Sequence, residues 1–543
     1  MIGYHRKSYV GAHNILLLVF LMGTLLFLIP LRGEAQDNRL IHTNSWQYEY
    51  IQRLQQRGHL LQLNPTDLPY AIEDIKMAIE NVDASGLSPQ EQRWMDRLDE
   101  SVKPRPTNID SMRVGGLFEP GVRRSSSERL NVDDPLGEGK PLLPRGRLNS
   151  YLEWKNWIGQ AGVTFDWFYD IDPDGLDTAR RLYIRSEDTY FGYNGEKLEV
   201  LVGRFNNHWS VFGRQGGFLT DNPRSFDQIQ LTFGGSKLSF SSILGELDNM
   251  SPDSTFTGSS YERGAFRRYL FLHRLDWSPV PNLKLSFIEG ELYFSETAGI
   301  SLRNLMPLHF LFFESHNAPM NNNSNLLLGG SIWYQKGNWT FYVQAMLDDL
   351  VYKDRDKLRE DNDLIPTTYT INSSITLADV GNSFDVGLEA DLVGANAYRS
   401  NRDQDQWTYA QRGLATNFSD YIRTKAYATF YPNWMEGLKV EPAVTLYYKG
   451  TEDLRDLRTS TEPDGTQIPA ILAGTVERTI RPSLNLRYQP MGTTVFNPKH
   501  DIRFNFWVDA DMGVNITHNH NNIKGATNRR FIGLFRLFGQ FAF

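Results

Sequence analysis

The sequence predicts an all-β transmembrane barrel of about 18 antiparallel strands, preceded by a small N-terminal helical domain. Three observations predict this fold class: the last residues alternate as a membrane strand does, the first residues form a secretory signal, and the composition is polar but aromatic. The 543 residues include no Cys, 13% of them are aromatic, and the mean hydropathy is −0.44. Membrane barrels combine these properties because only alternate residues of each strand meet lipid.

The C-terminal segment, residues 531–543, alternates between two kinds of side chain. Strand side chains have a period of two, so an apolar face can meet lipid while the opposite face meets an aqueous lumen. The apolar face holds Phe531, Phe535, Leu537, Phe541 and Phe543, and the polar face holds Arg536 and Gln540. A buried strand of a soluble sandwich would also alternate, but the other end of the chain favours the membrane.

The N-terminus has the three parts of a secretory signal. Arg6 and Lys7 precede an apolar run over residues 15–31, and Gly33-Glu34-Ala35 offers the small residues that a signal peptidase reads. We expect a signal peptide over residues 1–35; an uncleaved anchor is the alternative, although the run is near the lower length limit for a membrane span. The predicted location is the outer membrane of a Gram-negative-type bacterium.

Charge and cysteine content restrict the classes of partner. Removal of residues 1–35 changes the net charge from −8 to −10, which does not favour nucleic acid. Without Cys, the chain is expected to be neither a lipid-anchored lipoprotein nor a disulfide-stapled domain. We expect a monomeric barrel in outer-membrane lipid that needs no cofactor.

Residues 36–103 have the spacing of three short amphipathic helices. The apolar positions of these helices are Trp46, Tyr50, Ile51 and Leu54, then Ile72, Ile75 and Ile79 after Pro69, then Trp94 and Leu98. Ser88-Pro89-Gln90-Glu91 has the form of a capping box for the third helix. Three such helices make a small core, so we expect them to pack against the periplasmic end of the barrel or enter its lumen. A free-standing bundle is the alternative.

Residues 104–147 are rich in Gly, Pro, Ser and Arg, and we interpret them as a connecting segment that holds at most one strand. The barrel is predicted over residues 148–543. With about 22 residues for one strand and its share of loop, these 396 residues allow about 18 strands. The longest polar loops, where function is expected, are residues 354–363, 398–413, 451–474 and 515–530.

Few residues suggest chemistry. Asp170-Ile171-Asp172-Pro173-Asp174-Gly175 opens like a calcium loop, but Arg181 replaces the bidentate Glu, so no metal is predicted. A barrel hydrolase is a third functional class; its candidate histidines, His208, His273, His309 and His316, show no triad spacing. Residues 321–325, rich in Asn, could bind sugar hydroxyls or form a solvated turn. The chain is predicted not to be an enzyme.

The order of motifs resembles the Wzi-like capsule-assembly proteins of the outer membrane. In the helical region, the matching residues are Tyr50, Leu54, Gly58, Leu63, Pro65-Thr66 and Pro69-Tyr70. In the barrel, they are Gly203-Arg204, Trp209, Gly213, Gly217, Asp221-Asn222-Pro223, Arg274, Leu275, Trp277, Pro279, Glu289, Asn304, Pro307, Asn325, Gln344, Asp348-Asp349, Tyr409, Gly413 and Asp420. Ser210-Val211-Phe212 and Phe418-Ser419 depart from the pattern. The first departure, in the segment after Trp209, leaves open which polysaccharide such a protein would bind.

The resemblance implies a lectin-like barrel, closed by its helical domain, that binds exported capsular polysaccharide or exopolysaccharide and helps to assemble or anchor it. Sugars need aromatic rings and polar side chains, and Trp407, Tyr409 and Arg412 offer both in one predicted outer loop; an aromatic girdle at the membrane interface is the alternative. The resemblance adds Arg204, Trp209, Asp348 and Asp349 as candidate glycan contacts; a lumenal salt-bridge network would also explain Arg204 and the two aspartates. A porin or nutrient channel is the second functional class.

Overall fold

The computed structural model describes most of the chain. The described residues are 37–103, 108–109, 112–130, 135–136, 142–175, 184–250, 256–258, 266–295, 309–313, 324–348, 368–381, 384–458, 468–490, 494–497 and 502–543. The predicted signal peptide, the loop at 354–363, Arg181, Asn304, Pro307, His316 and Asp349 lie outside them.

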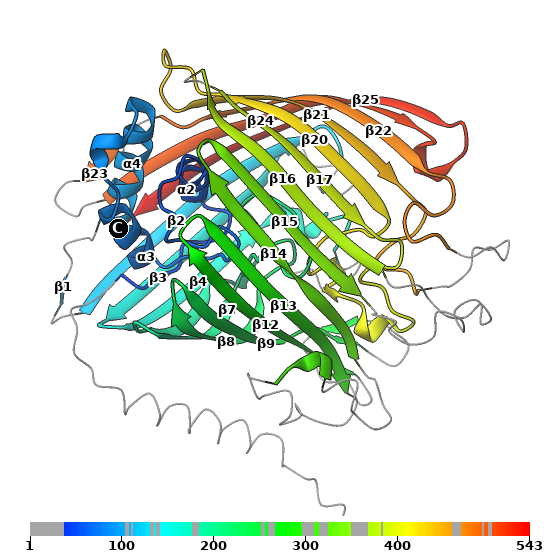
Figure 1. Ribbon diagram of the computed structural model, residues 1–543, viewed down its shortest axis with the longest axis horizontal. Helices are drawn as coiled ribbons and strands as arrows, with labels where there is room; N and C mark the ends of the chain where they lie inside the picture. Colours follow the sequence, from blue (N-terminus) through cyan, green and yellow to red (C-terminus); the bar gives the residue numbers. More distant parts are fainter. Residues whose placement is uncertain are drawn as a thin grey trace, which may run out of the picture.

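The predicted barrel of about 18 strands is confirmed: the sheet closes as an 18-stranded antiparallel barrel (Figure 1). Its strands are β2 (Met112–Ser125), β3 (Leu143–Trp154), β4 (Trp157–Asp166), β5 (Ile184–Ser186) with β6 (Thr189–Asn194) in one position, β7 (Leu198–Phe205), β8 (Phe226–Gly235), β9 (Leu238–Glu246), β12 (Arg267–Val280), β13 (Leu283–Ser295), β14 (Ser324–Lys336), β15 (Trp339–Asp348), β16 (Thr368–Val380), β17 (Phe384–Val393), β20 (Tyr421–Phe430), β21 (Leu438–Lys449), β22 (Glu477–Tyr488), β24 (Ile502–His518) and β25 (Thr527–Ala542). Short strands outside this count are β1 (Asn108–Ile109), β10 (Asn249–Met250), β11 (Phe256–Gly258), β18 (Thr408–Tyr409), β19 (Arg412–Gly413) and β23 (Thr494–Asn497).

The barrel begins earlier than residue 148, so the predicted boundary is wrong. Strand β2 lies within the segment interpreted as a connection, and it closes the barrel by pairing with β25. Its glycines hide the strand pattern, because they make room for aromatic rings of neighbouring strands. A Cβ at Gly116 would lie 2.3 Å from the ring of Phe543, and one at Gly115 would lie 2.3 Å from the Tyr151 hydroxyl oxygen.

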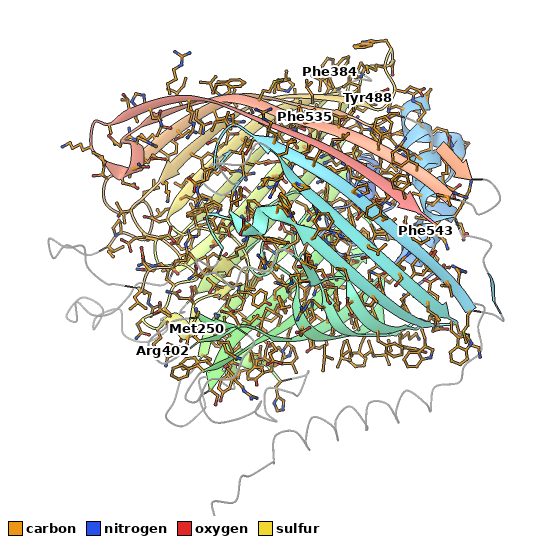
Figure 2. The ribbon with its side chains drawn as sticks, turned by 180° about the vertical axis from the view of Figure 1, so that it is seen from behind. Met250, Phe384, Arg402, Tyr488, Phe535 and Phe543 are labelled. Carbon is orange, nitrogen blue, oxygen red and sulfur yellow. The ribbon has the colours of Figure 1, made fainter. Side chains whose placement is uncertain are left out.

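The outer face of the wall is apolar, as the C-terminal alternation predicts. Phe531, Phe535 and Leu537 are 59%, 48% and 39% exposed (Figure 2). On the opposite face, Arg536 bonds to Asp509 of β24, and Gln540 donates to Glu119 of β2 at 2.9 Å. Other exposed apolar residues on the wall include Leu148, Val163, Phe191, Leu275, Ile332, Phe341, Leu388, Val444 and Ile480.

The wall therefore presents apolar side chains to lipid, and the chain is an outer-membrane barrel protein. Within the described ranges, no helix is long and apolar enough to cross a bilayer.

The structure agrees with some of the predicted outer loops and differs from the prediction at residues 515–530. Residues 398–413 and the described part of 451–474 lie in connections at the barrel end opposite the C-terminus. Half of residues 515–530 is strand instead, because β24 runs to His518 and β25 starts at Thr527. The alternation of these strands is concealed there because both of their faces carry polar side chains.

Residues 37–103 form the predicted helical domain, with α2 (Gln47–Gln56), α3 (Ile72–Glu80) and α4 (Pro89–Val102). The capping box is present, since Ser88 and Glu91 exchange hydrogen bonds of 2.7 and 3.3 Å. The predicted apolar positions form the core, and Leu54, Ile75 and Leu98 are completely buried. Figure 1 shows α2 within the barrel and α3 and α4 at the end where the C-terminus lies.

Candidate functional site

Two long connections fold back into the barrel from the end opposite the C-terminus. Residues 206–225 and 394–420, which we call the loop plug, share one apolar core with inward-facing residues of β12 and β13. The Trp407 indole N–H donates to the Phe218 carbonyl at 2.8 Å, and the Thr220 N–H donates to the Leu414 carbonyl at 2.9 Å. The loop plug therefore fills that part of the lumen.

The N-terminal domain fills the other end and touches the loop plug. Leu68 and His208 exchange backbone hydrogen bonds of 3.1 and 2.9 Å. Arg274 of β12 is completely buried; it donates to the Thr66 carbonyl at 2.5 Å and to Asp276 at 2.8 Å. Its guanidinium also lies 5.5 Å from the Trp209 ring. Arg274 thus joins the wall, the N-terminal domain and the loop plug.

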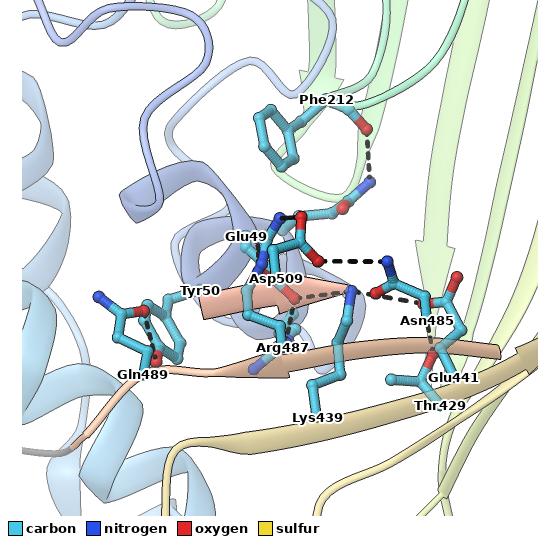
Figure 3. A network of polar contacts seen from close by, with 12 residues as sticks. Glu49, Tyr50, Phe212, Thr429, Lys439, Glu441, Asn485, Arg487, Gln489 and Asp509 are labelled. Atoms are coloured by element: carbon cyan, nitrogen blue, oxygen red, sulfur yellow. Dashed lines mark hydrogen bonds and ion pairs between the residues drawn. The ribbon is translucent and has the colours of Figure 1, made fainter. Parts of the chain in front are cut away.

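Helix α2 is held against the wall by the ion-pair network in Figure 3. Glu49 accepts a hydrogen bond from Arg487 of β22 and forms an ion pair of 3.1 Å with Lys439 of β21. Arg53, one helical turn further on, also pairs with Glu49. Asp509 of β24 continues the network, since it lies 3.3 Å from Arg487.

This network predicts a pH dependence. Burial raises the pKa of Glu49, but the charges of Arg487, Arg53 and Lys439 outweigh burial and hold it well below the usual value. A carboxylate with a lowered pKa in the folded state contributes stability above its unfolded pKa of about 4.3, and that stability is lost as the pH falls through the folded pKa. We expect Glu49→Gln to lower the unfolding midpoint at neutral pH and to flatten its decline in acid, measured by thermal unfolding at several pH values.

The matched control is Asp99→Asn, because Asp99 and its partner Lys103 are both largely exposed. This control should leave the midpoint within experimental error of the wild type. Parallel pH curves for wild type and Glu49→Gln would contradict the prediction.

A cavity of about 730 Å³ lies between the N-terminal domain and the loop plug. Strands β2, β3, β17, β20 to β22, β24 and β25 contribute charged side chains to its wall. Eleven Lys or Arg and seven Asp or Glu line it, although the chain as a whole has a net charge of −8. Aromatic residues also line it, namely Trp46, Tyr48, Tyr70, Phe168, Phe212, Trp333, Tyr342, Tyr427, Tyr431, Trp507 and Phe538.

The predicted sugar-stacking loop turns inward. Trp407 is completely buried in the loop plug, so both its display on an outer loop and its place in an interfacial girdle are wrong. Tyr409 is half-buried, with its ring 5.8 Å from that of Phe226. Arg412 lines the cavity and donates to the Asn222 carbonyl at 2.8 Å and to Asp172 at 2.7 Å.

The other predicted contacts are not brought together. Trp209 is completely buried in the loop plug. Arg204 shares the outward parity of Val202 in β7 and pairs with the exposed Asp227 at 3.0 Å, so it is not part of a lumenal network. Asp348 is buried inside the barrel and accepts the Tyr398 N–H at 2.6 Å.

The calcium-like segment, residues 170–175, forms ion pairs with arginines of neighbouring loops. Asp172 pairs with Arg412, and Asp174 pairs with Arg129 and Arg455, which come from other extracellular connections. Because these carboxylates already face arginines, they tie neighbouring loops together. Within the described part of the chain, no group of three potential metal ligands is found.

Two of the histidines considered for a hydrolase, His208 and His273, have structural partners, whereas the buried Nδ1 atom of His309 has no hydrogen-bond partner within the described residues. His208 lies 2.9 Å from Asp221 and 3.1 Å from the Val211 carbonyl. His273 lies 3.0 Å from Glu289, whose carboxylate also accepts the Leu311 N–H at 3.0 Å. These two pairs include no Ser. Asn325 is buried and donates to the Asp405 carbonyl at 3.2 Å, so this end of the Asn-rich segment is not a solvated turn.

Sequence reasoning missed the charged cavity. Arg145 and Arg147 alternate with Pro144, Gly146 and Leu148 in β3, which is the signal for inward-facing cations. Because residues 104–147 are interpreted from the sequence as a connecting segment, these inward-facing cations are not predicted.

Comparison with solved structures agrees with this architecture. Wzi of Escherichia coli, described as an outer membrane protein involved in group 1 capsule assembly and a carbohydrate binding β-barrel, is 10% identical. It covers 93% of this chain and 99% of its own, with a TM-score of 0.60. OccK11 (OpdR) and OccD3 (OpdP) of Pseudomonas aeruginosa are 12% and 11% identical, cover 80% of this chain and 96% and 92% of theirs, and have TM-scores of 0.41 and 0.44.

No protein-family model matches the chain, and no curated protein matches it. The likeness to Wzi, at 10% identity, is a likeness of fold. The chain therefore has the fold of an outer-membrane β-barrel whose lumen holds its N-terminal domain and two of its own loops.

Proposed function

We propose that this protein binds exported capsular polysaccharide or exopolysaccharide and helps to assemble or anchor it at the cell surface. The observation that carries the proposal is the lumen, which is occupied from both ends and keeps a polar, aromatic cavity between the two fillings. A channel for free solute passage needs an open lumen, whereas a binding protein needs fixed polar and aromatic groups. The carbohydrate-binding barrel of similar fold supports the same function.

The chemistry of the cavity suits a glycan. Sugars offer hydroxyl edges to amides and guanidinium groups and apolar faces to aromatic rings. Arg412 and Asn222 lie on the loop side of the cavity, and Tyr427 lies on the wall. We assign Arg412 as a candidate glycan contact, with Tyr409 beside it; Trp407, Trp209 and Asp348 hold the loop plug that presents them.

The test is deletion of the gene in its host, followed by measurement of cell-attached, released and total surface polysaccharide. We expect the attached fraction to fall and the released fraction to rise while total synthesis stays constant, because anchoring acts after export. Complementation with the intact gene is the control. Unchanged fractions would overturn the proposal, and a large steady conductance of the purified barrel in planar bilayers would then favour the porin.

A further inference from the structure

Three arginines from adjacent strands meet at one side of the cavity. Arg123 of β2 stands directly opposite Arg536 of β25 in the strand register, and Arg145 follows on β3, two positions from the partner of Arg123. All three line the cavity. Their side chains keep 22%, 36% and 30% of their area accessible, so solutes within the cavity can reach them.

The acidic groups nearby do not balance these charges. Asp166 lies 3.9 Å from both Arg123 and Arg145, beyond hydrogen-bond distance. Asp509 bonds to Arg536 but is shared with Arg487. Within the described residues, the buried Nε and Nη2 atoms of Arg123 and the Nε atom of Arg536 have no hydrogen-bond partner. Arg123 is attracted by Asp166 and repelled by the charges of both Arg145 and Arg536.

Cations elsewhere on the same wall are paired. Arg423 lies 2.9 Å from Glu389 and 3.2 Å from Asp391, and Lys425 lies 2.8 Å from Glu441. Like charges directly opposite each other destabilise a sheet. Arg123, Arg145 and Arg536, which we call the arginine cluster, therefore form a local excess of positive charge.

We propose that the arginine cluster binds the carboxylate of an acidic sugar residue, so that the glycan taken by this protein is anionic. This inference rests on the proposed function. A guanidinium presents two parallel N–H groups that match a carboxylate, and such charge-assisted bonds are stronger than bonds to a neutral hydroxyl. The Phe168 ring, 3.9 Å from the Arg123 guanidinium, holds this group in place. A neutral sugar would leave this local excess of positive charge uncompensated.

The test measures binding of two matched probes to the full-length protein in detergent by calorimetry. Hyaluronan tetrasaccharide carries carboxylates, and tetra-N-acetylchitotetraose is neutral. We expect the wild type to bind the acidic probe at least tenfold more tightly than the neutral probe. Arg123→Gln and Arg536→Gln should each remove about tenfold of that affinity, or ~1.4 kcal/mol. Arg529→Gln, an exposed position of the same strand, is the control and should bind as the wild type does.

Each contrary result would contradict a different claim. Equal affinity for the two probes would overturn the anionic specificity while leaving glycan binding intact. Binding of neither probe would overturn this inference, and the attachment experiment would still decide the proposed function. Arginine-dependent binding of sodium sulfate or inorganic phosphate without competition by the acidic probe would show a site for an inorganic anion, which also contradicts the proposal.

Thermal unfolding at low salt, first without and then with the acidic probe, gives a second readout. Because Arg123→Gln removes a repelling charge, its midpoint should lie a few degrees above that of the wild type. The acidic probe should raise the midpoint of the wild type and leave that of Arg123→Gln unchanged. A lower midpoint for Arg123→Gln would contradict the charge excess.

Discussion

Replacement of Arg274 by Ala should destabilise the folded protein by about 3–5 kcal/mol, the cost of removing one partner from a buried ion pair. Asp276 would keep its charge inside the barrel, and the Thr66 carbonyl would lose its 2.5 Å donor. Because Thr66 belongs to the N-terminal domain, the loss should first release this domain from the wall. Guanidinium chloride unfolding in lipid vesicles, followed by tryptophan fluorescence, measures the change.

The matched control for this prediction is Arg204→Ala. It removes the same side chain from another Arg–Asp pair, but Arg204 and Asp227 are 26% and 61% exposed. Surface pairs contribute about 0–1 kcal/mol, so the control should stay within that range. Similar losses for the two variants would show that Arg274 does not join the N-terminal domain to the wall.

Replacement of Trp407 by Ala should cost about 3–5 kcal/mol and loosen the loop plug, since the ring is completely buried. The ring also fills the space beside Gly290 of β13, where a Cβ would lie 2.8 Å from it. Loss of the ring and of its bond to the Phe218 carbonyl removes contacts between the two loops. We expect a lower unfolding midpoint together with more frequent conductance events in planar bilayers.

Trp434→Ala is the control for Trp407→Ala, because Trp434 lies in a turn and is 77% exposed. It should change the free energy of unfolding by no more than about 0.5 kcal/mol and should leave the conductance unchanged. If Trp407→Ala shows unchanged stability and no additional conductance events, the loop plug is held without this side chain.

The two variants test different ends of the same lumen. Arg274 secures the N-terminal domain through Thr66, and Trp407 secures the loop plug through Phe218. If the protein binds glycan in the cavity between them, both variants should also release surface polysaccharide in the host, since each disturbs one boundary of the cavity.

The sequence by itself determined the parts of the structure that depend on local pattern. The alternation of residues 531–543 predicted which face of β25 meets lipid, because strand side chains have a fixed period of two. The Ser88 to Glu91 spacing predicted the start of α4, because a capping box involves only one helical turn. The strand number followed from length and the spacing of such patterns.

Only the tertiary structure decided what lies inside the barrel. Trp407 lies in a segment with the composition of an outer loop. The segment nevertheless folds inward and buries this residue, because apolar side chains of β12 and β13 offer a core there. The arginine cluster depends on the pairing of β25 with β2, which joins residues more than 400 positions apart. Sequence pattern fixes the face on which a side chain lies; closure of the sheet fixes which side chains that face then meets.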